Sequence, residues 1–209
     1  MTADAVEIRP IREAELDELF DFLCLVHQHP QGRARYHSYV HGDPTWAPWQ
    51  TPVVVIDGRL VSTLRIWDRQ IHVGATPLRM GGIGGVTTHP GYRRRGLATA
   101  MMAYAADAMR SAGIDLGLLF TEIPARFYRR LGWCNVPLAG FSATLHHRGS
   151  PTSDAAVVAF EETRDLQEVV ALYQRHNAGH SGTMLRPQTY WDCAPSRARG
   201  VLPNVVVRD

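Results

Sequence analysis

Residues 81–98 constrain this chain more than any other stretch, because a glycine-rich segment leads through three consecutive arginines into the start of a predicted helix. A strand that passes through a short loop into a helix leaves backbone N–H groups without partners at the helix N-terminus, and such groups bind anions. Small residues let an anion approach the main chain, while guanidinium groups add positive charge. The residues expected at this anion site are Arg93, Arg94, Arg95, Gly96, Leu97 and Ala98.

An arginine triplet alone is more often a solvated turn or a weak nucleic-acid patch. The surroundings of this triplet favour a phosphate site instead, because a strand-like run precedes it and a long amphipathic segment follows it. A dinucleotide-binding fingerprint does not fit, since its third glycine would fall at Thr87, and no Lys-Ser/Thr pair follows to make a P-loop. We therefore expect residues 81–98 to cradle a pyrophosphate group.

The length of 209 residues leaves room for one full domain and part of a second. The formal net charge of +2 is too small for general binding to nucleic acid or to a membrane, so the expected partners are small molecules or peptides. No apolar run approaches the roughly 18–20 residues of a membrane helix, and the acidic start lacks the layout of a signal peptide. The sequence predicts a cytoplasmic protein and leaves the formation of a homo-oligomer open.

The three cysteines are widely separated and form no Cys-x-x-Cys pair, which predicts reduced thiols rather than a disulfide or a zinc site. Two pairs of histidines are spaced by four residues and would share one face of a helix, but no Glu-x-x-His pattern or acidic third ligand accompanies them. These pairs are His37 with His41 and His176 with His180. No metal site is predicted.

Hydrophobic periodicity predicts an alternation of strands and helices over the first two thirds of the chain. Strands are expected at residues 6–11, 52–56, 59–66, 70–73, 78–88, 114–120 and 141–145, and helices at 13–27, 99–112 and 125–131. Asp57 and Gly58 are expected to form a type I′ hairpin turn, since both residues readily adopt positive φ angles. The glycines of the 78–88 strand favour a bulge or a close approach of the backbone to a ligand. Residues 29–50 are expected to form a loop or a short helix.

A polar stretch at residues 146–154 is expected to be a linker. Beyond it, a strand at 157–162, helices at about 166–173 and 186–191, and a strand at 201–207 repeat the opening order of strand then helix. We therefore divide the chain into a first domain at residues 1–149 and a second, incomplete unit at residues 150–209.

Two motifs resemble the GNAT superfamily of acetyltransferases. Residues 93–98 read Arg-x-x-Gly-x-Ala, which is similar to the coenzyme A motif of that superfamily, and residues 128–133 read Tyr-Arg-Arg-Leu-Gly-Trp, which is similar to its tyrosine signature. The resemblance implies a layered α/β (α+β) fold, with a mixed, mostly antiparallel sheet and flanking helices. It also implies acetyl-CoA as the co-substrate, with the pantetheine arm hydrogen-bonded to an open strand edge at Val86, Thr87 and Thr88.

In the GNAT fold, residues 29–50 would form one wall of the acceptor site. Aromatic side chains in this region either contact the substrate or cap the core, and the residues alone favour neither alternative. These aromatic residues are Tyr36, Tyr39, Trp46 and Trp49.

A third motif is similar to the tandem-GNAT enhanced intracellular survival (Eis) branch. Residues 172–177 read Leu-Tyr-x-Arg-x-Asn and residues 182–191 read Gly-x-Met-Leu-Arg-x-x-x-Tyr-Trp, as at the start of the second GNAT-like unit of that branch. The resemblance implies a truncated chain and suggests an aminoglycoside-like polyamine as the acceptor. The sequence offers no dense acidic patch to support such an acceptor.

The resemblance makes Tyr128 the candidate general acid that protonates the departing thiolate of coenzyme A. The alternative role is that of a half-buried helix tyrosine. The general base stays open between Glu122, which could also face a helix dipole, and His89, which could also be a turn residue. In the Eis branch the carboxylate at the chain's own C-terminus is thought to act as base, and this sequence stops well short of that domain.

The sequence therefore predicts an acetyl-CoA-dependent N-acetyltransferase that transfers the acetyl group to a primary amine of a small molecule or peptide by direct attack. The alternative is a non-catalytic acyl-CoA binding or sensing module, which would keep the anion site but would not need Tyr128.

Overall fold

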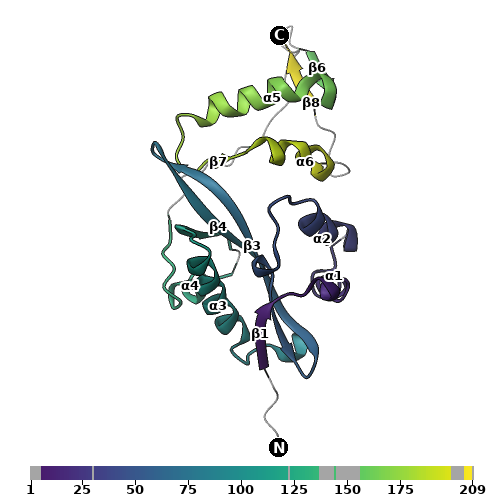
Figure 1. The fold of residues 1–209 in the computed structure, drawn as a ribbon, viewed down its shortest axis with the longest axis vertical. Helices are drawn as coiled ribbons and strands as arrows, with labels where there is room; N and C mark the ends of the chain where they lie inside the picture. The colour runs from purple at the N-terminus through teal and green to yellow at the C-terminus, as the bar shows by residue number, and fades with distance from the viewer. Residues whose placement is uncertain are drawn as a thin grey trace, which may run out of the picture.

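The computed structural model describes residues 6–29, 31–121, 123–136, 144, 156–198 and 205–208 (Figure 1). Its helices are η1 (Glu13–Glu15), α1 (Leu16–His27), α2 (Gly32–His41), η2 (Pro48–Gln50), η3 (Pro90–Tyr92), α3 (Leu97–Ser111), α4 (Arg126–Arg129), α5 (Glu162–Asn177) and α6 (Gln188–Ala198). Its strands are β1 (Val6–Pro10), β2 (Pro52–Ile56), β3 (Arg59–Val73), β4 (Thr76–Thr88), β5 (Leu116–Leu119), β6 (Ala156–Ala159), β7 (Met184–Leu185) and β8 (Val205–Arg208). The predicted strand at 141–145, apart from residue 144, and the predicted linker at 146–154 lie outside the described residues.

A central sheet with the strand order β1-β2-β3-β4-β5 organises the fold. Neighbouring strands in this order are antiparallel, except β4 and β5, which run parallel. Helices α1 and α2 lie on one face of the sheet, and α3 and α4 lie on the other (Figure 1). The chain thus has the expected mixed, mostly antiparallel sheet with flanking helices.

The turn between β2 and β3 is the predicted hairpin turn. Asp57 and Gly58 have φ angles of +50° and +76°, so both central residues are left-handed, as a type I′ turn requires. The first strand pair after the turn joins Ile56 to Arg59. The prediction for this hairpin is confirmed.

The separate strand predicted at residues 70–73 is wrong, because β3 runs without a break to Val73. It pairs with β4 along this whole stretch, up to Val73 opposite Thr76. Asp68 and Arg69 interrupt the apolar pattern in the gap between the two predicted strands. Both side chains form ion pairs, which lets polar residues occupy the middle of a strand.

Helices α3 and α4 differ in length from their predictions, and α5 and α6 are both longer than predicted. α3 begins at Leu97 rather than at residue 99, and the chain turns out of it at Gly113, whose φ is +71°. The helix predicted at 125–131 is reduced to α4, because the backbone leaves the helix in a turn that ends at Gly132, with φ of +87°. Glycine ends both helices by taking a left-handed conformation that other residues rarely adopt.

Two apolar cores hold the layers together. The core between α3 and the sheet contains Met101 and Ala105, each 0 % exposed. The core on the opposite face joins α1 and α2 to the sheet and contains Leu19, Phe20 and Val53. Burial of one large apolar side chain stabilises the fold by about 1.5–3 kcal/mol. These cores fix the end of α1 and the start of α3 on opposite sides of β4.

The C-terminal elements attach to the far end of β3 (Figure 1). β7 pairs with β3 through Leu185 opposite Gln70 and Met184 opposite Ile71. The amide of Gly74 also donates a hydrogen bond of 2.8 Å to the hydroxyl of Ser181. β6 and β8 form a separate two-stranded sheet, beside α5 and α6. The strand and the two helices predicted between residues 157 and 191 are present, and β7 is an additional strand.

Candidate functional site

The candidate site begins where the central sheet opens. The pairing of β4 with β5 ends at Ile83, whereas β4 continues to Thr88. On its other side β4 pairs with β3, and the register of that pairing shifts next to Arg65. Gly85, in the same segment of β4, has a φ of +61°. The glycine-rich strand therefore contains the predicted bulge, and its residues 84–88 present an edge that β5 does not cover.

A cavity of about 270 Å³, here called the anion cavity, lies at the N-terminus of α3. Gly96 precedes the helix with a φ of +77°, and its carbonyl accepts the first helical hydrogen bond from Ala100 at 3.0 Å. N–H groups in the first turn of a helix have no partner within the helix and favour an anion. Of the predicted site residues, Thr88, Arg93, Arg94, Gly96, Leu97 and Ala98 line this cavity.

The three arginines take different positions. Arg93 lines the anion cavity and donates a hydrogen bond of 3.2 Å from Nε to the carbonyl of Thr88. Arg94 also lines the cavity, with a positive φ of 63°. The guanidinium of Arg95 instead lies over the ring of Tyr92, 4.9 Å from its centroid. The structure thus brings two of the three predicted arginines to the anion cavity.

Tyr128 lies on α4, next to a wall of the anion cavity. Its side chain is 8 % exposed and belongs to the core cluster that contains Leu97, the first residue of α3. Phe127 packs against the same core and also lines the anion cavity. The two rings lie 5.0 Å apart at an angle of 78°. The candidate acid is therefore held by packing beside the start of α3.

The structure describes one of the two candidate bases, His89, but not the other, Glu122. Glu122 lies outside the described residues. His89 accepts a hydrogen bond of 3.1 Å at Nδ1 from the amide of Gly91, at the start of η3. Its ring also lies edge-on to Tyr92, with centroids 5.6 Å apart. His89 thus lies in a turn, and it is not among the residues that line either the anion cavity or the cavity described next.

A second cavity of about 240 Å³, here called the aromatic cavity, lies on the opposite face of the sheet, between α1, α2 and the strands β3 and β4. Gly84 and Gly85 line it at the bulge of β4, together with the charged or titratable residues His27 and Arg65. Its apolar and aromatic walls include Phe20, Leu23, Tyr36, Tyr39, Val40 and Trp67.

The aromatic residues predicted for the acceptor wall all pack in the apolar cores, and two of them also line the aromatic cavity. Tyr36 and Tyr39 line the aromatic cavity. Trp46 and Trp49 instead pack against the two apolar cores, and the indole of Trp46 donates a hydrogen bond of 3.1 Å to the hydroxyl of Thr51. Tyr36 is also a buried member of the core on this face, and Tyr39 packs against that core, so a contact of these two tyrosines with the acceptor stays a prediction.

The remaining predicted cofactor residues lie along β4. Val86 is half-buried against the core under α3. Thr87 is buried, and its carbonyl accepts a hydrogen bond of 2.7 Å from the hydroxyl of Ser62. The hydroxyl of Thr87 lies 2.6 Å from Nε2 of His27. The side chain of Thr87 is therefore engaged with α1, and its carbonyl is engaged with β3.

Sequence reasoning missed His27 as a site residue. This histidine ends α1 and lines the aromatic cavity, although the residue as a whole is exposed. Partial burial of the ring and the nearby positive charge of Arg35 lower the pKa of His27 below its ordinary value of 6.5. The ring is therefore neutral at neutral pH and able to accept a proton.

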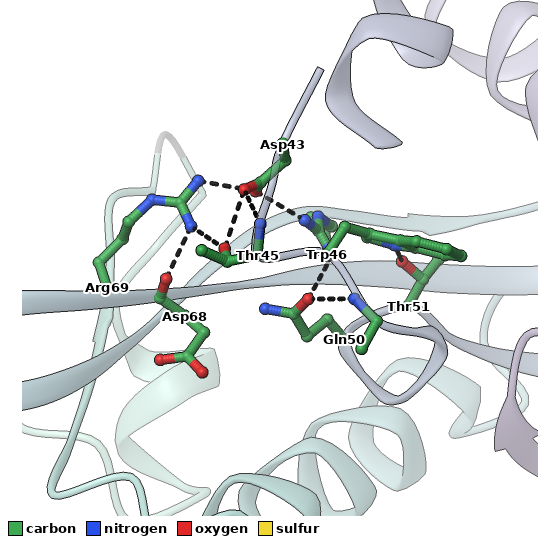
Figure 2. A network of polar contacts seen from close by, with 9 residues as sticks. Asp43, Thr45, Trp46, Gln50, Thr51, Asp68 and Arg69 are labelled. Atoms are coloured by element: carbon green, nitrogen blue, oxygen red, sulfur yellow. Dashed lines mark hydrogen bonds and ion pairs between the residues drawn. The ribbon is translucent and has the colours of Figure 1, made fainter. Parts of the chain in front are cut away.

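A buried ion network supports the wall formed by β3 (Figure 2). Asp43 Oδ2 accepts hydrogen bonds from Arg65 at 3.0 Å and from Arg69 at 2.7 Å. The hydroxyl of Thr45 donates a further hydrogen bond of 2.8 Å to Asp43. Burial alone would raise the pKa of Asp43, but the hydrogen bonds from Arg69 and Thr45 outweigh it and lower the pKa. Two guanidinium groups thus share one carboxylate.

A regular spacing of charged and aromatic residues in the sequence indicates this wall. Arg65, Trp67 and Arg69 are spaced by two residues on one strand, so they share a face of the sheet. Both guanidinium groups lie over the indole of Trp67, at 4.7 Å for Arg65 and 5.5 Å for Arg69.

No cluster of three metal-ligating side chains occurs among the residues that the structure describes. Within the same residues, no helix has the length and apolar character needed to cross a membrane.

Comparison with known families gives one match over most of the chain. A family model described as acetyltransferase (GNAT) domain matches residues 7–135, which contain both cavities. No curated protein sequence matches the chain.

Three solved structures are similar over nearly the whole chain. A probable N-acyltransferase from Enterococcus faecalis V583 has a TM-score of 0.69 and 19% identity, over 96% of this chain and 50% of its own. Eis1 from Mycobacterium abscessus has a TM-score of 0.65 and 17% identity, over 98% and 51%. A GCN5-related N-acetyltransferase from Kribbella flavida has a TM-score of 0.63 and 19% identity, over 99% and 53%. The chain spans about half the length of these structures, and at such identities the likeness shows the fold alone.

Proposed function

Because the chain belongs to the acetyltransferase (GNAT) family, whose members use acetyl-CoA, we propose that it is an N-acetyltransferase for a primary amine of a small molecule or peptide. The observation that carries the proposal is the position of the anion cavity, which adjoins the uncovered edge of β4 at Thr88. The same strand reaches the aromatic cavity at Gly84 and Gly85. The chain therefore offers one place for an anionic donor and another for an acceptor, with a strand edge between them.

Acetyl-CoA would supply the acetyl thioester when bound. Arg93, Arg94 and the first N–H groups of α3 would bind its pyrophosphate. The left-handed backbone of Gly96 fits this role, because it turns the chain so that α3 begins at the cavity. The main chain of residues 84–88 would hold the pantetheine arm as an added strand, over about 13 Å at 3.3 Å per residue.

The reacting groups would meet at the bulge of β4. A backbone N–H of this bulge would donate a hydrogen bond to the thioester oxygen, which stabilises the negative charge that develops there. Tyr128 would donate a proton to the departing thiolate of coenzyme A. The similarity of residues 128–133 to the tyrosine signature of the family supports this role.

We infer that His27 accepts the proton from the attacking amine. Four of the described residues that line the aromatic cavity are titratable, and His27 is the one whose ordinary pKa lies near neutral pH; the others are Tyr36, Tyr39 and Arg65. Its hydrogen bond with Thr87 fixes the orientation of the ring. A neutral amine would attack the thioester carbon, and the carbon–sulfur bond would break. The proton lost by the amine nitrogen would pass to His27, and Tyr128 would give a proton to the thiolate.

We also propose that residues 1–149 form the acetyltransferase domain and that residues 150–209 are the opening of a second GNAT-like unit of the Eis type. The likeness to Eis1, which extends over 98% of this chain, supports this assignment. The order of β6, α5 and α6 supports it as well, because it repeats the order of β1, α1 and α2.

The test is a thiol-release assay with acetyl-CoA and a panel of primary amines, together with mass spectrometry of the products and calorimetry with coenzyme A. We expect amine-dependent thiol release that matches the amount of N-acetylated product. Coenzyme A binding without product from any amine would favour the alternative, a non-catalytic acyl-CoA binding or sensing module. A chain that does not bind coenzyme A would exclude both functions.

A further inference from the structure

We propose that the aromatic cavity selects a small arylalkylamine, a primary amine on a short alkyl chain that ends in one aromatic ring, and that it rejects polycations. This inference deepens the proposed function and rests on it for the reaction, but it concerns the chemistry of the cavity and can be tested by binding alone.

The size of the aromatic cavity limits the acceptor. Its volume of about 240 Å³ lies below the roughly 300–1,000 Å³ of pockets that hold drug-sized ligands. One ring and a short chain suit this space, whereas an aminoglycoside with several sugar rings does not. The cavity reaches Gly84 and Gly85, and a Cβ built on Gly85 would meet no atom within 4 Å. The amine end of a slender acceptor therefore has open space next to the bulge of β4.

The walls of the cavity favour an aromatic ring. The ring of Tyr39 meets Trp67 edge to face, with centroids 5.2 Å apart at 80°. Tyr36 meets Tyr39 in the same manner, at 6.3 Å and 85°. A further aromatic ring can extend such a series, since edge-to-face pairs are more stable than their buried area alone would give. Phe20 and Leu23 complete an apolar surface that offers a sugar few hydrogen-bonding partners.

The charge of the cavity disfavours a polycation. No Asp or Glu is among the described residues that line it, whereas Arg65 is. The nearby carboxylate of Asp43 is 1% exposed and already binds both Arg65 and Arg69. Within this network of described residues, two cations share one anion, which leaves a net positive charge behind the wall. A second or third ammonium group on the acceptor would therefore be repelled, with no carboxylate to compensate.

The same positive charge helps a monoamine to react. A nearby cation disfavours the ammonium form of an amine and so lowers its pKa. The attacking group must be the neutral amine, so a cationic wall raises the reactive fraction. His27, at the same cavity, can then accept the proton that the amine nitrogen loses as the amide forms.

The first experiment measures binding by calorimetry to the full chain saturated with coenzyme A. The probes are phenethylamine, spermidine and kanamycin. We expect phenethylamine to bind at least tenfold more tightly than either polycation. Tighter binding of spermidine or kanamycin would overturn the proposal.

Two variants link the selectivity to the cavity. Tyr39→Ala removes an aromatic wall at a half-buried position and should weaken phenethylamine binding about tenfold, with unchanged binding of coenzyme A. Tyr104→Ala is the matched control, because Tyr104 is a half-buried tyrosine of α3 that lines neither cavity. Arg65→Gln should narrow the preference of the chain for phenethylamine over spermidine at least threefold. Equal effects of the two tyrosine variants, or an unchanged preference in Arg65→Gln, would contradict the proposal.

The thiol-release assay separates this inference from the proposed function. Selective binding of phenethylamine without thiol release would support the cavity's chemistry and overturn the transferase. Thiol release with kanamycin or spermidine in preference to phenethylamine would support the transferase and overturn the acceptor class.

Discussion

Nε2 of His27, at the end of α1, lies 2.6 Å from the hydroxyl oxygen of Thr87 on β4, although the two residues are 60 positions apart in the chain. The contact ties the aromatic cavity to the strand along which the donor is proposed to bind. It also gives the proposed base a fixed ring, which catalysis by proton transfer requires.

We predict that His27→Gln lowers kcat/KM by about 100-fold or more, within the range of 10²–10⁴ for a general base. In the parent chain kcat/KM should fall as the pH drops through the pKa of His27, because the protonated ring cannot accept a proton. This pKa lies below the ordinary 6.5, so the fall should come at acidic pH. The pH profile of kcat/KM checks both points, and the acidic limb should be absent from His27→Gln.

Thr87→Ser is the matched control for this prediction. It keeps the hydroxyl and should retain most of the activity, whereas Thr87→Val should lose part of it by freeing the ring. An acidic limb that persists in His27→Gln would assign the titration to another group and remove His27 from the mechanism.

Tyr128→Phe separates an enzyme from a binding module. The variant keeps the ring that packs beside Leu97, so its folding and its affinity for coenzyme A should not change. If Tyr128 protonates the thiolate, kcat should fall by about 10²–10⁴-fold. Calorimetry and steady-state kinetics on the same sample measure the two effects. Full activity in Tyr128→Phe would return this tyrosine to a packing role.

Arg94→Gln tests the anion cavity. A charge-assisted hydrogen bond contributes about 1.5–3 kcal/mol, so its loss should raise the Kd for coenzyme A by about 10–100-fold. Arg110→Gln is the control, because Arg110 is an exposed arginine in the last turn of the same helix, bonded to Asp107. Added salt should weaken binding less in Arg94→Gln than in the parent chain, since fewer charges meet the phosphates. Equal Kd values for the two variants would mean that the phosphates bind elsewhere.

The parts of the site that the sequence predicts are those made by neighbouring residues. Residues 93–98 contain their own loop, charges and helix start, and Asp57 with Gly58 specifies a turn without help from the rest of the chain. Local backbone chemistry decides these features, so they can be predicted from a short stretch of sequence.

The parts that the sequence does not predict depend on packing between distant segments. His27 resembles any polar residue at a helix end until α1 is laid over β4 and brings it to Thr87. Asp43 lies in a loop between α2 and η2 and has the pattern of a surface residue, but the fold buries it against β3. The ion pairs of Asp68 and Arg69 likewise explain why β3 continues through the polar residues between the two predicted strands.

Asp43→Asn tests the network behind the aromatic cavity. The substitution leaves two guanidinium groups, each 10% exposed, without their carboxylate, and breaking a buried pair costs about 3–5 kcal/mol. We expect a loss of this order in the free energy of unfolding, measured by urea denaturation at pH 7. Asp57→Asn is the control, because Asp57 is an exposed turn residue and asparagine accepts the same positive φ.

The pH dependence of this loss follows from the lowered pKa of Asp43. The hydrogen bonds from Arg69 and Thr45 keep the pKa in the folded state below its ordinary value of 3.8, so the ionised form stabilises the fold. This contribution is complete above the pKa of the unfolded state and is lost as the pH falls through the lower pKa of the folded state. The stability difference between the parent chain and Asp43→Asn should therefore be constant from pH 7 to about pH 5 and should shrink below about pH 4. A difference that stays constant in acid would mean that the charge of Asp43 does not hold Arg65 and Arg69 in place.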